Sequence, residues 1–322
     1  MNLDNVTILT PLYNDWAAAR SLIEKIDAVC GSWNARSVKV LIVDDASQQN
    51  CSGQLEHLPL ARIESVDVLR LVRNLGHQRA IAVGLTSLFE SDADTTVVVM
   101  DGDGEDNPDD IAELLSVATR HEFQKIVFAE RTIRSEGRVF CFFYQLYRTL
   151  HYILTGRQIR FGNFSVIPTG LLHPIVTVPD LWNHYAASVI SAKIPHTLVA
   201  TTRAKRYGGD SKMNFISLVT HGLGAISAHR ELVCARTLMI ISMAVVVSGG
   251  YLACTLFRSG RHASYAMTGP LIAVAILLIA TLLSIGLVLI FVTLGNRNRA
   301  SFVPIRDCGQ YVAGRNKRFV KS

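Results

Sequence analysis

An acidic turn is the part of the sequence best suited to chemistry. Residues 101–106 read Asp-Gly-Asp-Gly-Glu-Asp and come directly after an apolar run that ends at Met100. The glycines permit a tight turn, so the carboxylates of Asp101 and Asp103 can approach one divalent ion. Oxygen ligands of this kind suit Mg²⁺ or Mn²⁺, and such an ion can neutralise the charge of a departing phosphate. The turn therefore predicts metal-assisted phosphate chemistry.

Two other interpretations of this turn differ in strength. An EF-hand calcium loop is excluded, because Asp106 stands where that loop needs its glycine and a strand-like run precedes the turn. A structural turn that only starts the next helix stays open, since Pro108 followed by Asp109 and Asp110 is typical of a helix start. Helix capping and metal binding are compatible with each other.

Three more polar clusters follow apolar runs in the same way, at residues 10–15, 44–47 and 73–77. The apolar runs cover residues 6–9, 38–43, 66–72 and 95–100, and helical patterns lie between them at 16–29 and 78–89. Strands that alternate with helices form a mostly parallel α/β sheet. Ligands of such sheets bind at the carboxyl ends of the strands, where we expect all four clusters to meet.

Several common nucleotide and acyl-transfer motifs are missing from the sequence. The first strand is followed by Pro-Leu-Tyr-Asn at residues 11–14 where a dinucleotide-binding protein needs G-x-G-x-x-G. Neither a P-loop nor a G-x-S-x-G element occurs. Nicotinamide chemistry, P-loop kinase chemistry and serine-hydrolase chemistry are therefore not expected.

The composition indicates a membrane protein. Of 322 residues, 49% are hydrophobic and 18% are charged, against roughly 25% charged residues in an ordinary soluble domain. Residues 237–257 and 271–294 contain no charged side chain, and each exceeds the roughly 20 residues that a membrane-spanning helix needs. We expect a transmembrane hairpin over residues 233–296.

The distribution of charge predicts on which side of the membrane the other parts of the chain lie. Seven Lys and Arg residues follow the second apolar segment and two lie between the segments, so the positive-inside rule puts both termini in the cytoplasm. Residues 213–232 mix apolar and basic side chains and suit an amphipathic segment at the membrane interface, and 297–322 form a basic tail. The net charge of +6 does not favour a nucleic-acid partner. Six widely spaced cysteines indicate neither a zinc site nor a disulfide framework.

Five motifs occur in a familiar order. They are PLYND at 11–15, VDDAS at 43–47, RNLGHQ at 73–78, MDGD at 100–103 and RYGGDSK at 206–212. Together they resemble the GT-A-fold family 2 glycosyltransferases, in the polyprenyl-phosphate branch that includes dolichol-phosphate mannose synthases and bacterial undecaprenyl-phosphate glucosyltransferases. The resemblance covers roughly residues 5–232. It implies a GT-A catalytic domain at 1–212 whose partners are a nucleotide-diphosphate sugar and a polyprenyl phosphate.

The resemblance also implies roles for individual residues. The donor pocket would contain Pro11, Tyr13, Asp15, Val43, Asp45 and Gly102, together with Arg206 and Lys212 from a basic loop that closes over the donor phosphates. The metal ligands would be Asp101 and Asp103, joined by Glu105. For the segment between Arg206 and Lys212, a solvated turn is the alternative.

The acceptor phosphate needs cations on the membrane side of the sugar. Arg131 matches the family arginine, and Arg134 and Arg138 follow it, although the last two also suit ordinary solvated charges. Asn163 stands where relatives commonly carry an acidic residue credited with a catalytic role. A phosphate monoester, whose second pKa is about 6, is mostly dianionic at neutral pH and needs no general base. Asn163 is therefore expected at the catalytic centre as a hydrogen-bond partner of the acceptor or the sugar, and satisfying a buried turn is the alternative.

These residues predict an inverting, metal-dependent transfer of a sugar onto polyprenyl (undecaprenyl) phosphate. The reaction would take place at the cytoplasmic leaflet of the bacterial inner membrane, in a protein that could form a homo-oligomer. Two alternatives stay open at this point: a glycosyltransferase that acts on a glycolipid or a growing glycan, and a catalytically silent membrane protein of polysaccharide assembly. The sequence does not identify the sugar, because donor specificity depends on the shape of the pocket.

Overall fold

The structure is a computed structural model, and the chain divides into two compact units. The structure describes residues 4–49, 55, 58–91, 94–131, 145, 149, 152–156, 161–201, 230–259 and 268–320. The sheet unit comprises Met1–Cys141, Ile159–Ala228 and Phe302–Ser322, and the helical unit comprises Phe142–Gln158 and His229–Ser301.

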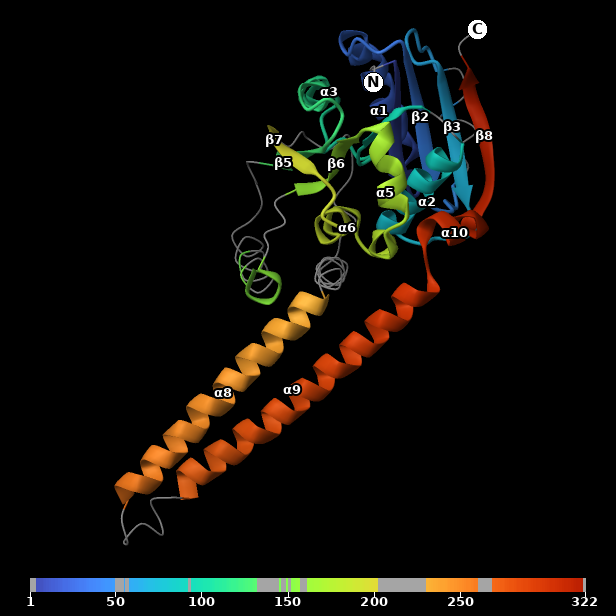
Figure 1. Ribbon diagram of the computed structural model, residues 1–322. Coiled ribbons are helices and arrows are strands. Elements are labelled where there is room, and N and C mark those ends of the chain that lie inside the picture. The colour runs from blue at the N-terminus through green and yellow to red at the C-terminus, as the bar shows by residue number, and fades with distance from the viewer. Residues whose placement is uncertain are drawn as a thin grey trace. The chain divides into compact units, whose positions relative to one another are not determined.

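The sheet unit is built on a mixed sheet with the strand order β7-β5-β6-β4-β1-β2-β3-β8 (Figure 1). The strands are β1 Asn5–Leu12, β2 Ser37–Asp44, β3 Ser65–Leu71, β4 Thr96–Val99, β5 Ile126–Arg131, β6 Phe161–Ile167, β7 His196–Thr201 and β8 Val312–Val320. Neighbours from β4 to β3 are parallel, as are β5 and β7. Strand β6 runs antiparallel to β4 and β5, and β8 runs antiparallel to β3.

Helices cover both faces of this sheet. On one face lie α1 (Trp16–Val29) and α3 (Ile111–Arg120); on the other lie α2 (His77–Glu90), α5 (Leu172–Val176) and α6 (Tyr185–Ser191). In β2, Val40 and Ile42 belong to the apolar cluster of α1, whereas Leu41 and Val43 belong to that of α2. Because successive side chains of a strand point to opposite faces, a segment buried on both sides is apolar at every position, as residues 40–43 of β2 are.

The four strands and two helices expected in residues 6–100 are confirmed, and so is the helix start at Pro108, where the side chain of Asn107 accepts a hydrogen bond from the backbone N–H of Asp109. The antiparallel strand β6 was not predicted. Its pairing places Ser165 opposite Val99, so the first residues of β6 lie beside the end of β4. This arrangement brings residues from two distant parts of the chain to one edge of the sheet.

The C-terminal segment returns to the sheet unit. After α10 (Pro304–Asp307), strand β8 pairs with β3 at the edge of the sheet. The guanidinium of Arg315 donates from Nε and Nη2 to Oδ2 of Asp67, at 3.1 Å and 2.7 Å. Strand β8 was not predicted, because the charges of residues 297–322 suggest only a basic tail.

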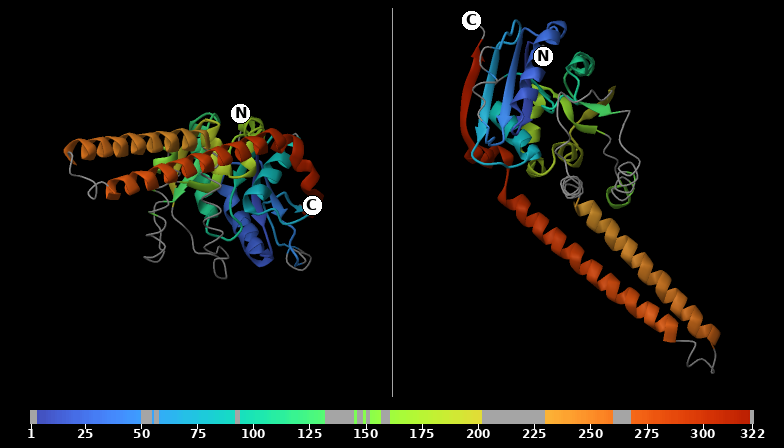
Figure 2. Two further views of the ribbon diagram at one scale, coloured as in Figure 1. Left: turned by 90° about the horizontal axis from the view of Figure 1, so that it is seen from below. Right: turned by 180° about the vertical axis from the view of Figure 1, so that it is seen from behind.

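The helical unit contains two long helices, α8 (Arg230–Ser259) and α9 (Thr268–Ser301), which pack against each other (Figures 1 and 2). These helices include both uncharged segments of the sequence. Among the described residues, Leu232–Tyr251 is long and apolar enough to cross a membrane, and Ile272–Leu287 is a shorter apolar stretch. Most of the segment expected at the membrane interface, residues 213–229, lies outside the described residues.

Candidate active site

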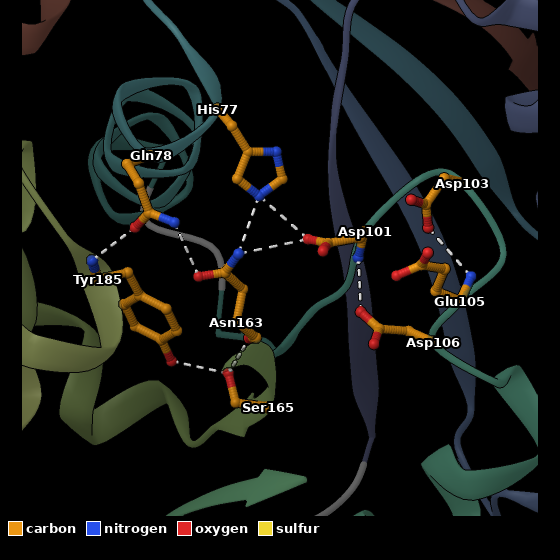
Figure 3. Close-up of polar contacts among 9 residues, drawn as sticks. All are labelled: His77, Gln78, Asp101, Asp103, Glu105, Asp106, Asn163, Ser165 and Tyr185. Atoms are coloured by element: carbon orange, nitrogen blue, oxygen red, sulfur yellow. Dashed lines mark hydrogen bonds and ion pairs between the residues drawn. The ribbon is translucent and has the colours of Figure 1, made fainter. Parts of the chain in front are cut away.

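The acidic turn is held in shape by two of its own carboxylates. Oδ2 of Asp106 accepts the backbone N–H of Asp101 at 2.9 Å, and Oδ1 of Asp103 accepts that of Glu105 at 3.0 Å (Figure 3). Gly104 has a φ of 85°, a conformation that glycine adopts without strain. The turn therefore has a defined shape at the carboxyl end of β4.

Gly102 allows this turn to lie close to β1. A Cβ atom at this position would come within 3.1 Å of Oγ1 of Thr10 and 3.4 Å of the carbonyl oxygen of Pro11. These contacts are tight for a real Cβ atom, so a side chain would push the turn away from the strand. The two glycines between the acids thus serve the packing and the curvature of the turn.

The side chain of Asp101 meets residues from two other elements. Its Oδ1 lies 3.1 Å from Nε2 of His77, at the start of α2, and 3.4 Å from Nδ2 of Asn163, in β6 (Figure 3). The Asp101 side chain is 26% exposed and that of His77 is 43% exposed. The end of β4, the start of β6 and the start of α2 thus converge at an accessible polar site.

His77 lies in a strongly negative environment. Desolvation alone lowers the pKa of His77, but the charges of Asp101, Asp106 and Asp103 and the hydrogen bond to Asp101 outweigh it, so the pKa is raised above its ordinary value. The same Nε2 is also 2.9 Å from Nδ2 of Asn163. One ring nitrogen cannot donate to Asp101 and accept from Asn163 at the same time, so the two contacts compete for it.

The acidic turn fits a divalent ion by the chemistry of its donor atoms. The carboxylates of Asp103 and Glu105 lie on the same side of the turn, whereas that of Asp101 points to His77 and Asn163 (Figure 3). No group of three or more His, Cys, Asp or Glu side chains gathers into a ligand cluster within the described part of the chain. Mg²⁺ is usually held by one or two carboxylates, with substrate phosphates and water as the other ligands. The two carboxylates of Asp103 and Glu105 on one side of the turn match the protein part of that pattern.

The predicted donor-pocket residues on β1 and β2 lie side by side. Pro11 pairs with Val43 in the parallel register of these strands. Tyr13 is 41% exposed beyond the end of β1, whereas Val43 is fully buried in the apolar core. Asp15 is partly exposed directly before α1. Tyr13 can thus contact a ligand, whereas the side chain of Val43 packs in the apolar core.

Asp45 makes a connection that the sequence analysis missed. Its carboxylate accepts the backbone N–H groups of Leu75 at 2.6 Å and Gly76 at 2.8 Å. Burial raises the pKa of Asp45 above its ordinary value, although these two hydrogen bonds oppose the shift. Gly76 has a φ of 92°, which favours glycine at the entry to α2. Asp45 therefore ties the end of β2 to the start of α2, the helix that presents His77.

His77, Gln78 and Asp106 belong to this site but were not predicted as site residues. His77 and Gln78 belong to the RNLGHQ motif, and their position at the start of a helix after a buried strand was a usable signal. Arg131 is the last residue of β5, and its side chain is not described. The other predicted cations, Arg134, Arg138, Arg206 and Lys212, lie outside the described residues.

Comparison with known sequences identifies relatives of the chain. The sequence model described as glycosyl transferase family 2 matches residues 7–171, just over half of the chain. An undecaprenyl-phosphate 4-deoxy-4-formamido-L-arabinose transferase of Proteus mirabilis is 25% identical over 67% of this chain and 65% of its own length. A protein of the same name from Klebsiella pneumoniae is 24% identical over 66% of this chain and 64% of its own length. The chain thus spans just under two thirds of these relatives.

Solved structures resemble the chain in fold. A mycobacterial protein has a TM-score of 0.50 at 14% identity, over 71% of this chain and 74% of that protein. Glucosyl-3-phosphoglycerate synthase from Mycobacterium tuberculosis, solved with Mn²⁺, UDP and glucosyl-3-phosphoglycerate, has a TM-score of 0.49 at 15% identity, over 71% and 80%. The extent of the family match, with the acidic turn at the carboxyl edge of the sheet, shows that the chain belongs to glycosyl transferase family 2.

Proposed function

We propose that the protein transfers one sugar, with inversion, from a nucleotide-diphosphate sugar to polyprenyl phosphate. The observation that carries the proposal is the meeting of Asp101, His77 and Asn163 at the carboxyl edge of a family 2 sheet. The undecaprenyl-phosphate transferases among its relatives support this class of acceptor. The same site would serve a glycolipid or glycan acceptor, so the experiment below includes that outcome.

The donor would bind across the ends of β1, β2 and β4. We assign Pro11, Tyr13, Asp15, Val43, Asp45 and Gly102 to the nucleotide side of the pocket, where the exposed ring of Tyr13 can stack on a base. Asp101 and Asp103, with Glu105 beside them, would hold Mg²⁺ or Mn²⁺. When bound, the ion would stabilise the negative charge that develops on the leaving diphosphate. Arg206 and Lys212 would add positive charge to the same phosphates.

The acceptor would approach from the other side of the sugar. Its phosphate is already dianionic at neutral pH, since its second pKa is about 6, and Arg131, Arg134 and Arg138 would hold it by charge-assisted hydrogen bonds. A phosphate oxygen attacks the anomeric carbon, the bond to the nucleoside diphosphate breaks, and the configuration inverts. The role of Asn163 is to orient its neighbours by hydrogen bonds, since a neutral amide cannot act as a general base at neutral pH.

The helical unit would anchor the enzyme beside its lipid substrate. We propose that α8 and α9 form the transmembrane hairpin, with residues 213–232 at the interface, and that both chain termini face the cytoplasm. The apolar stretch Leu232–Tyr251 supports a first span. Large apolar side chains on the two helices are exposed, among them Met243 at 68% and Leu282 at 69%. Exposure of these apolar surfaces to water would be unfavourable, whereas contact with the acyl chains of a bilayer would not.

A donor panel tests the proposal. Purified protein in detergent receives polyprenyl phosphate, Mn²⁺ and a set of labelled nucleotide sugars, and the lipid products are identified by mass. We expect a sugar–phosphate diester that mild acid hydrolyses. Asp103→Asn should slow its formation at least about 100-fold, the size of a lost charge-stabilising group. An acid-stable glycoside would favour a glycan acceptor, and absence of turnover with every donor would refute the proposal.

A further inference from the structure

A chain of amide contacts leads from the first residue of α6 to the acidic turn. The backbone N–H of Tyr185 donates to Oε1 of Gln78 at 2.8 Å, and Nε2 of Gln78 donates to Oδ1 of Asn163 at 3.0 Å. Nδ2 of Asn163 then lies 3.4 Å from Oδ1 of Asp101 (Figure 3). Gln78 has no role in the proposed reaction, although it connects Tyr185 to Asn163 in this series of hydrogen bonds.

Tyr185 fixes the direction of the first link. As the first residue of α6, it has a backbone N–H without a carbonyl partner inside the helix. A backbone N–H can only donate, and Tyr185 is fully buried, so leaving this group unpaired would be costly. The amide oxygen of Gln78 must therefore face Tyr185, and its NH₂ group must face Asn163.

The orientation of Gln78 determines that of Asn163. The oxygen of the Asn163 amide accepts from Gln78, so its NH₂ group faces His77 and Asp101. If this amide turned over, its NH₂ would meet the NH₂ of Gln78 and its oxygen would meet the Asp101 carboxylate. Both contacts would be repulsive, and they outweigh the single contact that could improve, between the Asn163 oxygen and a donating Nε2 of His77, so Asn163 is held as a donor to Asp101.

We propose that Gln78 is a positioning residue that, through Asn163, holds Oδ1 of Asp101 and so orients the carboxylate whose other oxygen, Oδ2, would bind the divalent ion. This inference rests on the proposed metal-binding role of the acidic turn. In known metal sites, altering a residue that orients a metal ligand typically lowers metal affinity or activity by about 10- to 100-fold. Gln78 touches neither Asp101 nor the turn in any contact described above, and its effect is transmitted by the Asn163 amide.

Gln78→Glu separates positioning from a merely structural role. A carboxylate accepts the N–H of Tyr185 as well as an amide oxygen does, so a residue that only caps α6 would tolerate this change. The second carboxylate oxygen, however, would face the oxygen of Asn163. The Asn163 amide would turn over and present its oxygen to Asp101. The added negative charge by itself would strengthen the attraction of a cation, so weaker binding cannot result from the charge.

The experiment is a double-mutant cycle on the full chain in detergent. It compares wild type, Gln78→Glu, Asn163→Ala and the double variant, with Gln124→Glu at an exposed position as the control for charge. Binding of Mn²⁺ alone is followed by the electron paramagnetic resonance of the free ion, and thermal unfolding and sugar transfer are measured on the same samples. We expect Gln78→Glu to weaken Mn²⁺ binding about 10-fold with an unchanged Tm. In the Asn163→Ala background the same change should have less than about a 2-fold effect, since coupled residues are not additive.

Several outcomes would overturn the inference. They are Mn²⁺ binding by Gln78→Glu as tight as in wild type, an equal loss in both backgrounds, or wild-type protein that does not bind Mn²⁺. If Gln78→Glu fails to fold, Gln78→Met, which loses both amide contacts, gives the same cycle with the same expected dependence on Asn163. Wild-type protein that binds Mn²⁺ but transfers no sugar would refute the proposed function, while Mn²⁺ binding by the variants would still test the role of Gln78.

Discussion

Aspartates of the sheet unit serve two different purposes. Asp27, Asp45 and Asp106 direct their carboxylates to backbone N–H groups and hold loops in place. Asp101 instead meets side chains at an accessible edge. All of them follow or lie within apolar segments, so residue type and spacing alone do not separate the two groups. For this reason the sequence suggested a donor-pocket role for Asp45 and did not reveal its bond to the start of α2.

Asp27 provides a test of the aspartates that bind backbone N–H groups. Its carboxylate accepts the N–H groups of Ala61, Arg62 and Ile63 at 2.8–2.9 Å. Burial raises the pKa of Asp27, but these three hydrogen bonds outweigh it and the pKa is lowered overall. Asp27→Asn should therefore reduce the free energy of unfolding by about 1–3 kcal/mol near neutral pH.

The sign of the pH dependence follows from the lowered pKa. The stabilisation by Asp27 is fully present above the unfolded pKa of about 3.9 and is lost as pH falls through the lower folded pKa. Thermal unfolding of wild type and Asp27→Asn between pH 7 and pH 3 should show a difference in Tm that narrows below about pH 4. Asp94→Asn, at an exposed position, is the matched control. A difference that stays constant over this range would contradict the assignment.

At the scale of elements, the central strands were predictable and the added strands were not. Strands β2 and β4 are buried on both faces, and the sequence shows this as uninterrupted apolar runs at residues 40–43 and 97–99. Strand β6 is short and contains Gly162 and Asn163, and β8 contains three cations in nine residues. Charged side chains are common on edge strands, so the pattern of β8 resembles a soluble tail. Only the pairing with β3 reveals it as part of the sheet.

The Asp67–Arg315 ion pair should hold β8 in place. The Asp67 side chain is 8% exposed, so loss of its partner leaves a nearly buried charge. Arg315→Ala should lower the free energy of unfolding by up to about 3 kcal/mol, the lower end for a buried pair, because the guanidinium is 37% exposed. Arg315→Lys should recover part of the loss, since a lysine keeps the charge but not the geometry of the guanidinium.

Chemical unfolding of the purified chain measures this effect. Arg120→Ala, which removes an ion pair exposed on both sides, is the control and should cost no more than about 1 kcal/mol. In the Asp67→Asn background, Arg315→Ala should have a smaller effect than in wild type, because the two residues are coupled. Equal effects in both backgrounds would show that Arg315 stabilises the chain without Asp67.

At the scale of the whole molecule, the chain combines an α/β sheet unit with a helical unit of different composition. The charge-free segments at 237–257 and 271–294 predicted both long helices. Membrane crossing can be tested at Val246, which lies within the apolar stretch of α8 and is 73% exposed. An arginine near the middle of a membrane-spanning helix costs about 2.5–3.5 kcal/mol in insertion experiments.

Val246→Arg should therefore reduce the fraction of chain inserted into membranes. Carbonate extraction of membranes that express the variant measures that fraction, and Gln124→Arg in the sheet unit is the control. We expect a larger extractable fraction for Val246→Arg and no change for the control. Equal extraction of Val246→Arg and wild type would contradict a transmembrane role for α8.

The central claim is that a divalent ion at the acidic turn drives the transfer of a sugar to polyprenyl phosphate. The most direct measurement is the initial rate of lipid-linked sugar formation by EDTA-treated protein before and after Mn²⁺ is restored, in wild type and Asp103→Asn. We expect almost no product without the ion, full recovery in wild type and little recovery in Asp103→Asn. A wild-type rate that EDTA leaves unchanged would contradict it.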